Sequence, residues 1–401
     1  MEPASGEHTP VDAKYAPEPD SLKAAMVDSL INGRVVSDQR VLTALRTVPR
    51  HLFLPSVSLY EAYEDTAVPT HWNSGVAISS ASQPSMVALM LEQLQVETGM
   101  NVLEIGAGTG YNAALLAELV GATGAVTTID ISPEFVQEAR ENLERAGYSR
   151  VRARAADGAY GWAESAPYDR IIVTAATGDI TPYWFEQLKD GGLLVAPFWL
   201  RGTEASIAFR KSDGMLGSDT LTPCRFMPLR GDAATSTHWC YLPNGRQLFA
   251  ERADVIAPLV NQLLMEHTRS RFFAPNDHAF VQFLGARGHD IFWLYTAGKS
   301  LDARRTRWGL LREDRSGATS MVISFSQVPV LLLFGGVAAE ETIRSEGAMW
   351  RKLGSPGLAT WRVKAWPRTE QPGDIADETT ITRRHFVFTI SFGGSQRIVH
   401  G

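Results

Sequence analysis

Residues 101–111 read NVLEIGAGTGY, a short apolar run followed at once by three glycines in alternate positions. Residues 102–105 are predicted to form a buried strand, and a helix is predicted from about Tyr111 to Leu119. A glycine-rich turn between a strand and a helix lets the backbone approach a nucleotide-like ligand closely. The turn alone is weak evidence, because glycines at this spacing also occur in ordinary loops.

Alternating strands and helices continue after this turn. Ser132, Pro133 and Gly147 are suited to the N-cap, the first position and the C-terminal stop of one helix. Repeated βα units predict an α/β fold, here a Rossmann-like domain with a doubly wound, mostly parallel sheet. The other predicted elements are strands at 125–129, 151–155, 170–174 and 193–197, helices at 22–31 (N-cap Ser21), 37–48 (N-cap Ser37) and 182–188, and a turn at Gly191-Gly192.

Length and composition predict a globular protein of two domains, since the 401 residues are 44% hydrophobic and 20% charged. Residues 1–20 are predicted to be a disordered tail, residues 21–231 the Rossmann-like domain, and residues 240–401 a C-terminal α+β domain that recognises the substrate. The predicted elements of this last domain are a helix at 256–267 and strands at 280–284, 321–325 and 385–392. Five arginines concentrate positive charge in this domain, and they either bind an acidic peptide or belong to a solvated loop. They are Arg304, Arg305, Arg307, Arg312 and Arg315.

Charge, cysteine content and hydropathy exclude several classes. The net charge of -6 gives no electrostatic reason to expect a nucleic-acid partner. The two cysteines, Cys224 and Cys240, are too few for a disulfide framework, and no zinc-ligand spacing surrounds them, so no metal is expected. The most apolar run, residues 328–339, is too short to span a bilayer. No signal peptide is recognisable, so a cytoplasmic protein without membrane contact is expected.

Acidic residues near the ends of the predicted strands indicate a nucleoside cofactor. Asp130 ends the second strand, where its carboxylate can accept both ribose hydroxyls, and Asp157 follows the third strand, where it can accept from an adenine amino group. Dinucleotide binding is the alternative, but it usually requires a third glycine where Tyr111 stands, and the acidic Glu104 suits a cationic sulfonium. The predicted cofactor is therefore S-adenosylmethionine, with S-adenosylhomocysteine as its product. The predicted contacts are Glu104, Gly106, Ala107, Gly108, Gly110, Asp130, Ile131, Asp157 and Gly158.

Several further segments are similar to one family. They are DQRVL at 38–42, VPRHLFLP at 48–55, AYED at 62–65, SQPSMVA at 82–88, VLEIGAGTGY at 102–111, DG at 157–158, YDRIIVTA at 168–175 and FMPL at 226–229. Together they resemble the protein-L-isoaspartate O-methyltransferase family, over residues 22 to about 231. The resemblance implies carboxyl methylation of a peptide or protein substrate that bears Asp or isoAsp. It also implies that Ser82 is the catalytic serine and that Ile78 and Ser79 lie on the cofactor side.

Ser82 has two interpretations. A substrate carboxylate is already ionised at pH 7, because its reference pKa is about 4, so the enzyme must mainly align it with the methyl group and strip its water. The Ser82 hydroxyl can donate a hydrogen bond that serves this purpose. Alternatively, a serine before Gln-Pro can cap a helix that begins near Pro84.

Two features differ from those of family members that repair isoaspartate in proteins, and they change the expected substrate from isoaspartate to ordinary aspartate. The lead into Ser82, HWNSGVAISSA at 71–81, is longer than usual, and about 170 residues follow the Rossmann-like domain. Both features resemble relatives from actinobacterial clusters for ribosomal peptides (lanthipeptides, graspetides, lasso peptides), including FxLD-system methyltransferases. That resemblance implies esterification of an ordinary aspartate in a modified precursor peptide, after which the ester closes to a succinimide (aspartimide). A repair methyltransferase for L-isoaspartate or D-aspartate with an accessory domain is the alternative.

Overall fold

The computed structural model describes residues 18–235, 238–242, 246–250, 253–263, 267–270, 278–295, 306–313, 319–324, 331–370 and 378–392. The chain forms two compact units, Met1–Met100 with Ala107–Arg154, and Asn101–Gly106 with Ala155–Gly401. Most of the predicted tail at 1–20 lies outside the described residues. Its last two residues, Pro19 and Asp20, already belong to the first helix.

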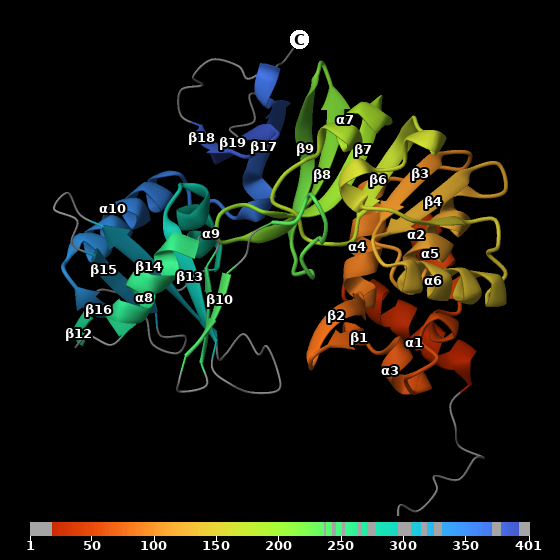
Figure 1. The fold of residues 1–401 in the computed structure, drawn as a ribbon, viewed down its shortest axis with the longest axis horizontal. Coiled ribbons are helices and arrows are strands. Elements are labelled where there is room, and N and C mark those ends of the chain that lie inside the picture. Colours follow the sequence, from red (N-terminus) through yellow and green to blue (C-terminus); the bar gives the residue numbers. More distant parts are fainter. Residues whose placement is uncertain are drawn as a thin grey trace, which may run out of the picture. The chain divides into compact units, whose positions relative to one another are not determined.

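The first unit begins with short helices whose caps differ from those predicted. They are α1 (Pro19–Asn32), α2 (Gln39–Thr47), the 3-10 helix η2 (Arg50–Phe53) and α3 (Leu59–Tyr63), shown in red and orange in Figure 1. Ser21 is not a cap, because α1 starts two residues earlier. Asp38 caps α2 by accepting a backbone amide at 2.8 Å. The predicted cap, Ser37, instead donates its amide and its hydroxyl to Glu92 Oε1.

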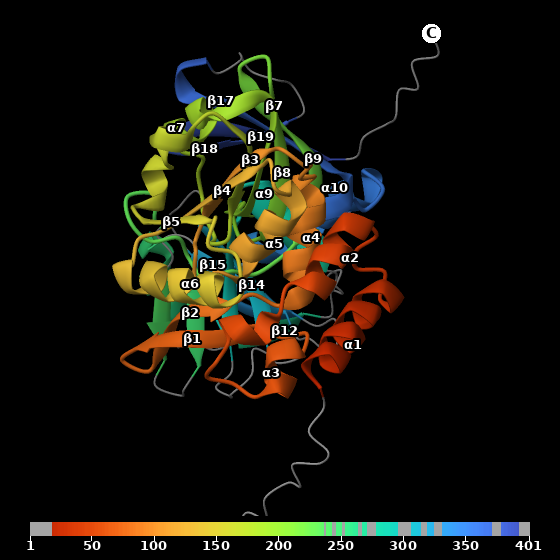
Figure 2. The same cartoon turned by 90° about the vertical axis from the view of Figure 1, so that its right-hand side faces the viewer.

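A hairpin and three longer helices complete the first unit. The hairpin pairs β1 (Val68–Asn73) antiparallel with β2 (Val76–Ala81), and α4 (Pro84–Leu94) follows it. After the glycine turn come α5 (Tyr111–Val120), β4 (Ala125–Asp130), α6 (Pro133–Arg145) and most of β5 (Arg152–Ala155) (Figure 2). Ser132 caps α6 through the Phe135 amide at 3.4 Å, which confirms that predicted helix start. Helix α2 packs against α4 and α5, and their apolar faces form the core of this unit.

The second unit carries the strand that leads into the glycine turn. Its first sheet has the strand order β18-β19-β17-β9-β8-β7-β6-β3. Strands β3, β6 and β7 are parallel, whereas the pairs from β7 outward to β18 are antiparallel. The strands are β3 (Asn101–Ile105), β6 (Tyr168–Val173), β7 (Leu188–Trp199), β8 (Glu204–Ser212), β9 (Met215–Pro223), β17 (Trp361–Pro367), β18 (Thr379–Thr382) and β19 (Phe386–Phe392). Two 3-10 helices, η3 (Gly158–Tyr160) and η4 (Ala163–Ser165), precede β6, and helix α7 (Pro182–Gln187) follows it. The predicted turn at Gly191-Gly192 lies within β7, which starts at Leu188.

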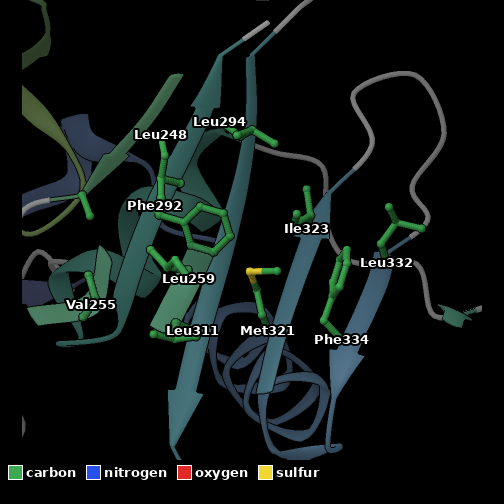
Figure 3. Packing of buried hydrophobic residues seen from close by; sticks show 11 residues of the cluster. Leu248, Val255, Leu259, Phe292, Leu294, Leu311, Met321, Ile323, Leu332 and Phe334 are labelled. Atoms are coloured by element: carbon green, nitrogen blue, oxygen red, sulfur yellow. The ribbon is translucent and has the colours of Figure 1, made fainter. Parts of the chain in front are cut away.

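The second sheet of this unit is antiparallel, in the order β10-β11-β13-β14-β15-β16-β12. Its strands are β10 (His238–Tyr241), β11 (Gln247–Ala250), β12 (His267–Ser270), β13 (Asp290–Tyr295), β14 (Thr306–Glu313), β15 (Thr319–Ser324) and β16 (Leu331–Gly335). Helix α8 (Ile256–Leu263) packs on one face, where side chains from five strands, from the helix and from Val255 just before it form a buried cluster around Phe292 and Met321 (Figure 3). Helix α10 (Ala338–Lys352) contacts β14 and β15, and α9 (His278–Ala286) contacts α10 and β13.

The predicted fold class is confirmed: an α/β methyltransferase-type fold with additional C-terminal strands. One prediction for the C-terminal part is wrong, because residues 280–284 lie in α9 and not in a strand. The run FVQFL is buried at every position, so it carries no periodicity that separates a helix from a strand. The predicted helix at 256–267 also ends too late, since β12 begins at His267.

Sheet pairing crosses the predicted domain boundary. Strand β17 pairs with β9 at Lys364 and Gly217, and the Val363 amide donates to Ser218 Oγ at 2.9 Å. Strands β17, β18 and β19 therefore extend the same sheet that contains β3, β6 and β7. The predicted limits at 231 and 240 stay a prediction.

Two further expectations concern the arginines and the membrane. Arg307 and Arg312 lie five positions apart in β14, so their side chains point to opposite faces of the strand; the other three arginines lie outside the described residues. Among the helices that the structure describes, none has the length and apolar character that a membrane crossing requires. The described residues also contain no cluster of His, Cys, Asp or Glu suited to a metal ion.

Candidate active site

The second half of the glycine turn, in the first unit, is held by Asp130. Gly108 and Gly110 have φ angles of +49° and +88°. The Gly108 amide donates to Asp130 Oδ2 at 3.2 Å, and the Ala107 amide donates to the Ile129 carbonyl at 3.1 Å. A Cβ at Gly108 would have no atom within 4 Å, so this side of the turn is open to a ligand. Gly110 is different, because a Cβ there would press on α6.

Asp130 lies at the C-terminal end of β4 with only 9% of its surface exposed. Besides the Gly108 amide, it accepts the Ser132 amide on Oδ1 at 3.1 Å. Ile131, between them, is 37% exposed. A carboxylate oxygen can accept more than one hydrogen bond, so these backbone contacts are compatible with the predicted contact to the ribose hydroxyls. An open glycine turn beside an acceptor carboxylate fits the nucleoside part of S-adenosylmethionine.

The first half of the turn belongs to the second unit, where Glu104 and Gly106 lie at the end of β3. Glu104 is fully buried. Gly106 has a φ of +106°, and a Cβ there would lie 2.4 Å from Thr174 Oγ1. The Thr174 hydroxyl donates to the Gly106 carbonyl at 2.9 Å, so this side chain supports the turn from the end of β6. Thr174 belongs to the motif YDRIIVTA at 168–175, but the motif by itself does not indicate this supporting contact.

Asp157 already accepts two backbone hydrogen bonds. Its Oδ1 accepts the Ala159 amide at 2.9 Å, which caps η3, and its Oδ2 accepts the Asp232 amide at 2.9 Å. Gly158 has a steric reason to be glycine, because a Cβ there would lie 2.5 Å from Ile105 Cγ2. The adenine contact of Asp157 therefore stays a prediction that must use the remaining lone pairs.

Ser82 lies between β2 and α4, half-buried, and does not cap the helix. The N-cap of α4 is Gln83, which makes no side-chain cap. Instead, Asp65 accepts the Ser85 amide on Oδ1 at 2.8 Å and the Gln83 side chain on Oδ2 at 3.1 Å. Within the described residues, the Ser82 hydroxyl has no hydrogen-bond partner. The capping interpretation of Ser82 is therefore wrong, and the catalytic role of its hydroxyl stays a prediction.

Arg50 holds the backbone of the same segment. Its Nη2 donates to the Ser82 carbonyl at 2.9 Å, and its Nε donates to the Ala62 carbonyl at 2.8 Å. The guanidinium carbon lies 4.8 Å from the centre of the Tyr111 ring, at the first residue of α5. Burial raises the pKa of Tyr111 to about 12 and lowers the pKa of Arg50. Arg50 and Asp65 both belong to the motifs quoted above, but only the fold shows that they act on Ser82-Gln83-Pro84.

The β1–β2 hairpin carries Ile78 and Ser79, both half-buried. It is attached to α6 through His71, whose Nε2 lies 3.0 Å from Glu138 Oε2 and whose ring centre lies 4.3 Å from that of Phe135. Trp72 is 59% exposed. The hairpin thus leads directly into Ser82 with an exposed aromatic side chain near its tip.

Comparison with known proteins agrees with these motifs. The model of the family "Protein-L-isoaspartate(D-aspartate) O-methyltransferase (PCMT)" matches residues 21–234. The protein-L-isoaspartate O-methyltransferase of Methanococcoides burtonii is 43% identical over 195 residues, which are 49% of this chain and 94% of that protein. The enzyme of the same name from Hyperthermus butylicus is 43% identical over 216 residues, covering 52% of this chain and 88% of that protein.

A solved structure of a protein-L-isoaspartate O-methyltransferase extends the likeness. It is 26% identical, has a TM-score of 0.51, and covers 86% of this chain and 96% of its own length. The matched region therefore reaches well beyond residue 234. The expectation that the C-terminal extension separates this chain from isoaspartate methyltransferases is not supported. The chain belongs to the protein-L-isoaspartate(D-aspartate) O-methyltransferase family and is an S-adenosylmethionine-dependent carboxyl O-methyltransferase.

Proposed function

We propose that this protein methylates the free carboxylate of isoaspartyl residues in proteins or peptides. The observation that carries the proposal is the segment at Ser82: its backbone is held by Arg50, the following helix is capped by Asp65, and its hydroxyl has no partner in the part of the chain that the structure describes. The likeness to isoaspartate methyltransferases over both the family region and most of the C-terminal part supports the same substrate.

The chain's residues would act by orientation rather than by acid–base catalysis. The acceptor carboxylate is ionised at neutral pH, since its reference pKa is about 4. The Ser82 hydroxyl would donate to one carboxylate oxygen and direct the other toward the methyl group. S-adenosylmethionine, when bound, supplies this methyl group on a positively charged sulfur. Asp130 and the open face at Gly108 would hold its nucleoside.

A second candidate is methylation of an ordinary aspartate in a ribosomally made precursor peptide, with closure to a succinimide. The observation that favours it is the hairpin before Ser82, where Trp72 and Val76 are 59% and 61% exposed. Such apolar side chains suit contact with a longer peptide than the methylated residue alone. The comparisons favour the isoaspartyl substrate, because every relative named above is an isoaspartate methyltransferase.

Matched peptides separate the two candidates. Two peptides of one sequence, with isoAsp or Asp at a single position, are incubated with enzyme and S-adenosylmethionine and followed by mass spectrometry. We expect a methyl ester on the isoAsp peptide only. Methyl gain followed by methanol loss on the Asp peptide would contradict the proposal and support the precursor-peptide function. Ser82→Ala should lower kcat about 10- to 100-fold, because a hydrogen bond to a charged group contributes roughly 1.5–3 kcal/mol, whereas Ser80→Ala, a half-buried serine of β2, should not.

We also propose that residues 240–401 contribute to substrate recognition. The exposed Arg312 on β14 supports this role, because it can attract acidic residues that flank the acceptor. Arg312→Glu should lower kcat/KM for an isoAsp peptide with acidic flanks and leave an isoAsp peptide with neutral flanks unchanged. Equal effects on both peptides would contradict the recognition role.

A further inference from the structure

Arg50 is a buried cation that forms no ion pair with a carboxylate among the described residues, although the charge of Asp65 favours its charged form from further away. Only 1% of its surface is exposed, and within the described residues no ion pair reaches it. Two of its nitrogens donate to the carbonyls of Ala62 and Ser82, while Nη1 is buried without a partner. The hydroxyl of Tyr111, whose ring lies beside the guanidinium, is also buried and makes no hydrogen bond of ordinary geometry among the described residues, but it interacts electrostatically with Arg50.

This arrangement is costly for stability. A buried charge loses its hydration, and burial lowers the pKa of Arg50 even though two carbonyl acceptors, the Tyr111 side chain and the charge of Asp65 compensate part of this loss. An apolar side chain at the same place would avoid both the charge and the unpaired Nη1. Stability alone therefore does not explain why an arginine stands here.

The three groups that Arg50 touches come from separate parts of the first unit. Ala62 lies in α3, Ser82 follows β2, and Tyr111 begins α5 directly after Gly110. A guanidinium is planar and rigid, so its donors fix the directions as well as the distances of their acceptors. Arg50 thus sets the Ser82 backbone with respect to the helix that starts at the glycine turn.

We propose that Arg50 is a positioning residue for methyl transfer: it fixes Ser82 at a defined distance from the start of α5. Because Ser82 is the acceptor-side group only under the proposed function, this inference rests on that proposal. Arg50 acts through the backbone of Ser82 and leaves the hydroxyl free. Methyl transfer requires close alignment of the reacting atoms, so a small displacement of Ser82 lowers the rate strongly.

Arg50→Lys tests the proposal, because it keeps the charge but removes the planar pair of donors. With an isoAsp peptide we expect kcat to fall about 10- to 100-fold, with little change in the Kd of S-adenosylmethionine measured by calorimetry. Arg140→Lys is the matched control, since Arg140 also uses Nε and Nη2 on one backbone carbonyl, that of Ala153 at 3.2 and 2.7 Å. The control should leave kcat unchanged. Methylguanidinium added to Arg50→Ala should restore part of the lost kcat.

Hydrogen exchange gives a readout that does not depend on the substrate. Arg50→Lys should raise amide exchange across residues 82–86 more than elsewhere in the first unit, and Arg140→Lys should not. The positioning role would be overturned if Arg50→Lys left kcat unchanged. It would also be overturned if this variant lost kcat, cofactor affinity and protection from hydrogen exchange throughout the chain to the same extent. If the wild-type enzyme methylates neither the isoAsp peptide nor the matched Asp peptide, the proposed function fails. Amide exchange at residues 82–86 then still decides whether Arg50 orders this segment.

Discussion

The amide of Gly108 donates a hydrogen bond of 3.2 Å to Asp130 Oδ2, which joins the glycine turn to the end of β4. The same carboxylate accepts the Ser132 amide at the start of α6. One side chain therefore orders the turn, the strand end and the next helix, before any ligand contact is counted.

Asp130→Ala should weaken S-adenosylmethionine binding about 10- to 100-fold, because a hydrogen bond to a charged group contributes roughly 1.5–3 kcal/mol. Calorimetry measures the Kd. The matched control is Glu134→Ala, an exposed acid in the first turn of α6. Equal affinities of the two variants would show that Asp130 does not hold the cofactor.

Two glycines of the turn should respond differently to alanine. Gly106→Ala combines a φ of +106° with a Cβ that would lie 2.4 Å from Thr174 Oγ1, so we expect a loss of about 3 kcal/mol in unfolding free energy. Gly108→Ala has a φ of +49° and no atom within 4 Å of the new Cβ. It should cost only about 1 kcal/mol but should lower cofactor affinity, because the methyl group occupies the open face. Urea unfolding and calorimetry together check both; similar stability losses in the two variants would contradict this account.

Asp65→Ala should separate a helix cap from a functional role. Loss of a side-chain N-cap costs about 1 kcal/mol, and Asp38→Ala removes a comparable cap at α2. Both variants should therefore lose similar stability in thermal unfolding. Only Asp65→Ala should lower kcat, because it also releases Gln83 and Ser85 next to Ser82. If the two variants keep equal kcat, Asp65 serves stability alone.

Glu204 should make stability depend on pH. This first residue of β8 accepts the Phe226 amide at 2.6 Å, and burial raises its pKa from 4.5 to about 8. A carboxyl group whose pKa is higher in the folded chain contributes stability that is complete below about pH 4.5 and is lost as the pH rises toward 8. Melting temperatures between pH 5 and 8 should fall more for the wild type than for Glu204→Gln, which stays neutral. Parallel curves would mean that Glu204 is ionised throughout this range.

Local sequence patterns predicted the alternating strands and helices from β3 to α7 well, because glycine, proline and capping residues mark the turns between them. Ser132 and Pro133 mark the start of α6, and the structure confirms them. The cap of α4 was not predictable in this way, because Asp65 stands twenty positions away from Ser85. A side chain that acts on a distant backbone group leaves no periodic signal.

The same limit applies to the C-terminal part. The run at 280–284 is apolar at most positions, so only its packing against α10 and β13 shows that it is a helix. The pairing of β17 with β9 could not be predicted from the sequence either, because the local pattern of a strand does not indicate which distant strand it pairs with.

The pairing of β9 with β17 sets an order of events during synthesis. Ser218 and Val363 stand 145 positions apart, so β9 leaves the ribosome long before its partner exists. Until then one edge of β9 exposes unpaired amides and carbonyls, which favour pairing with other chains. Contacts of such long range also slow folding. Late completion of the sheet therefore makes the nascent chain a candidate client of chaperones that bind exposed strands.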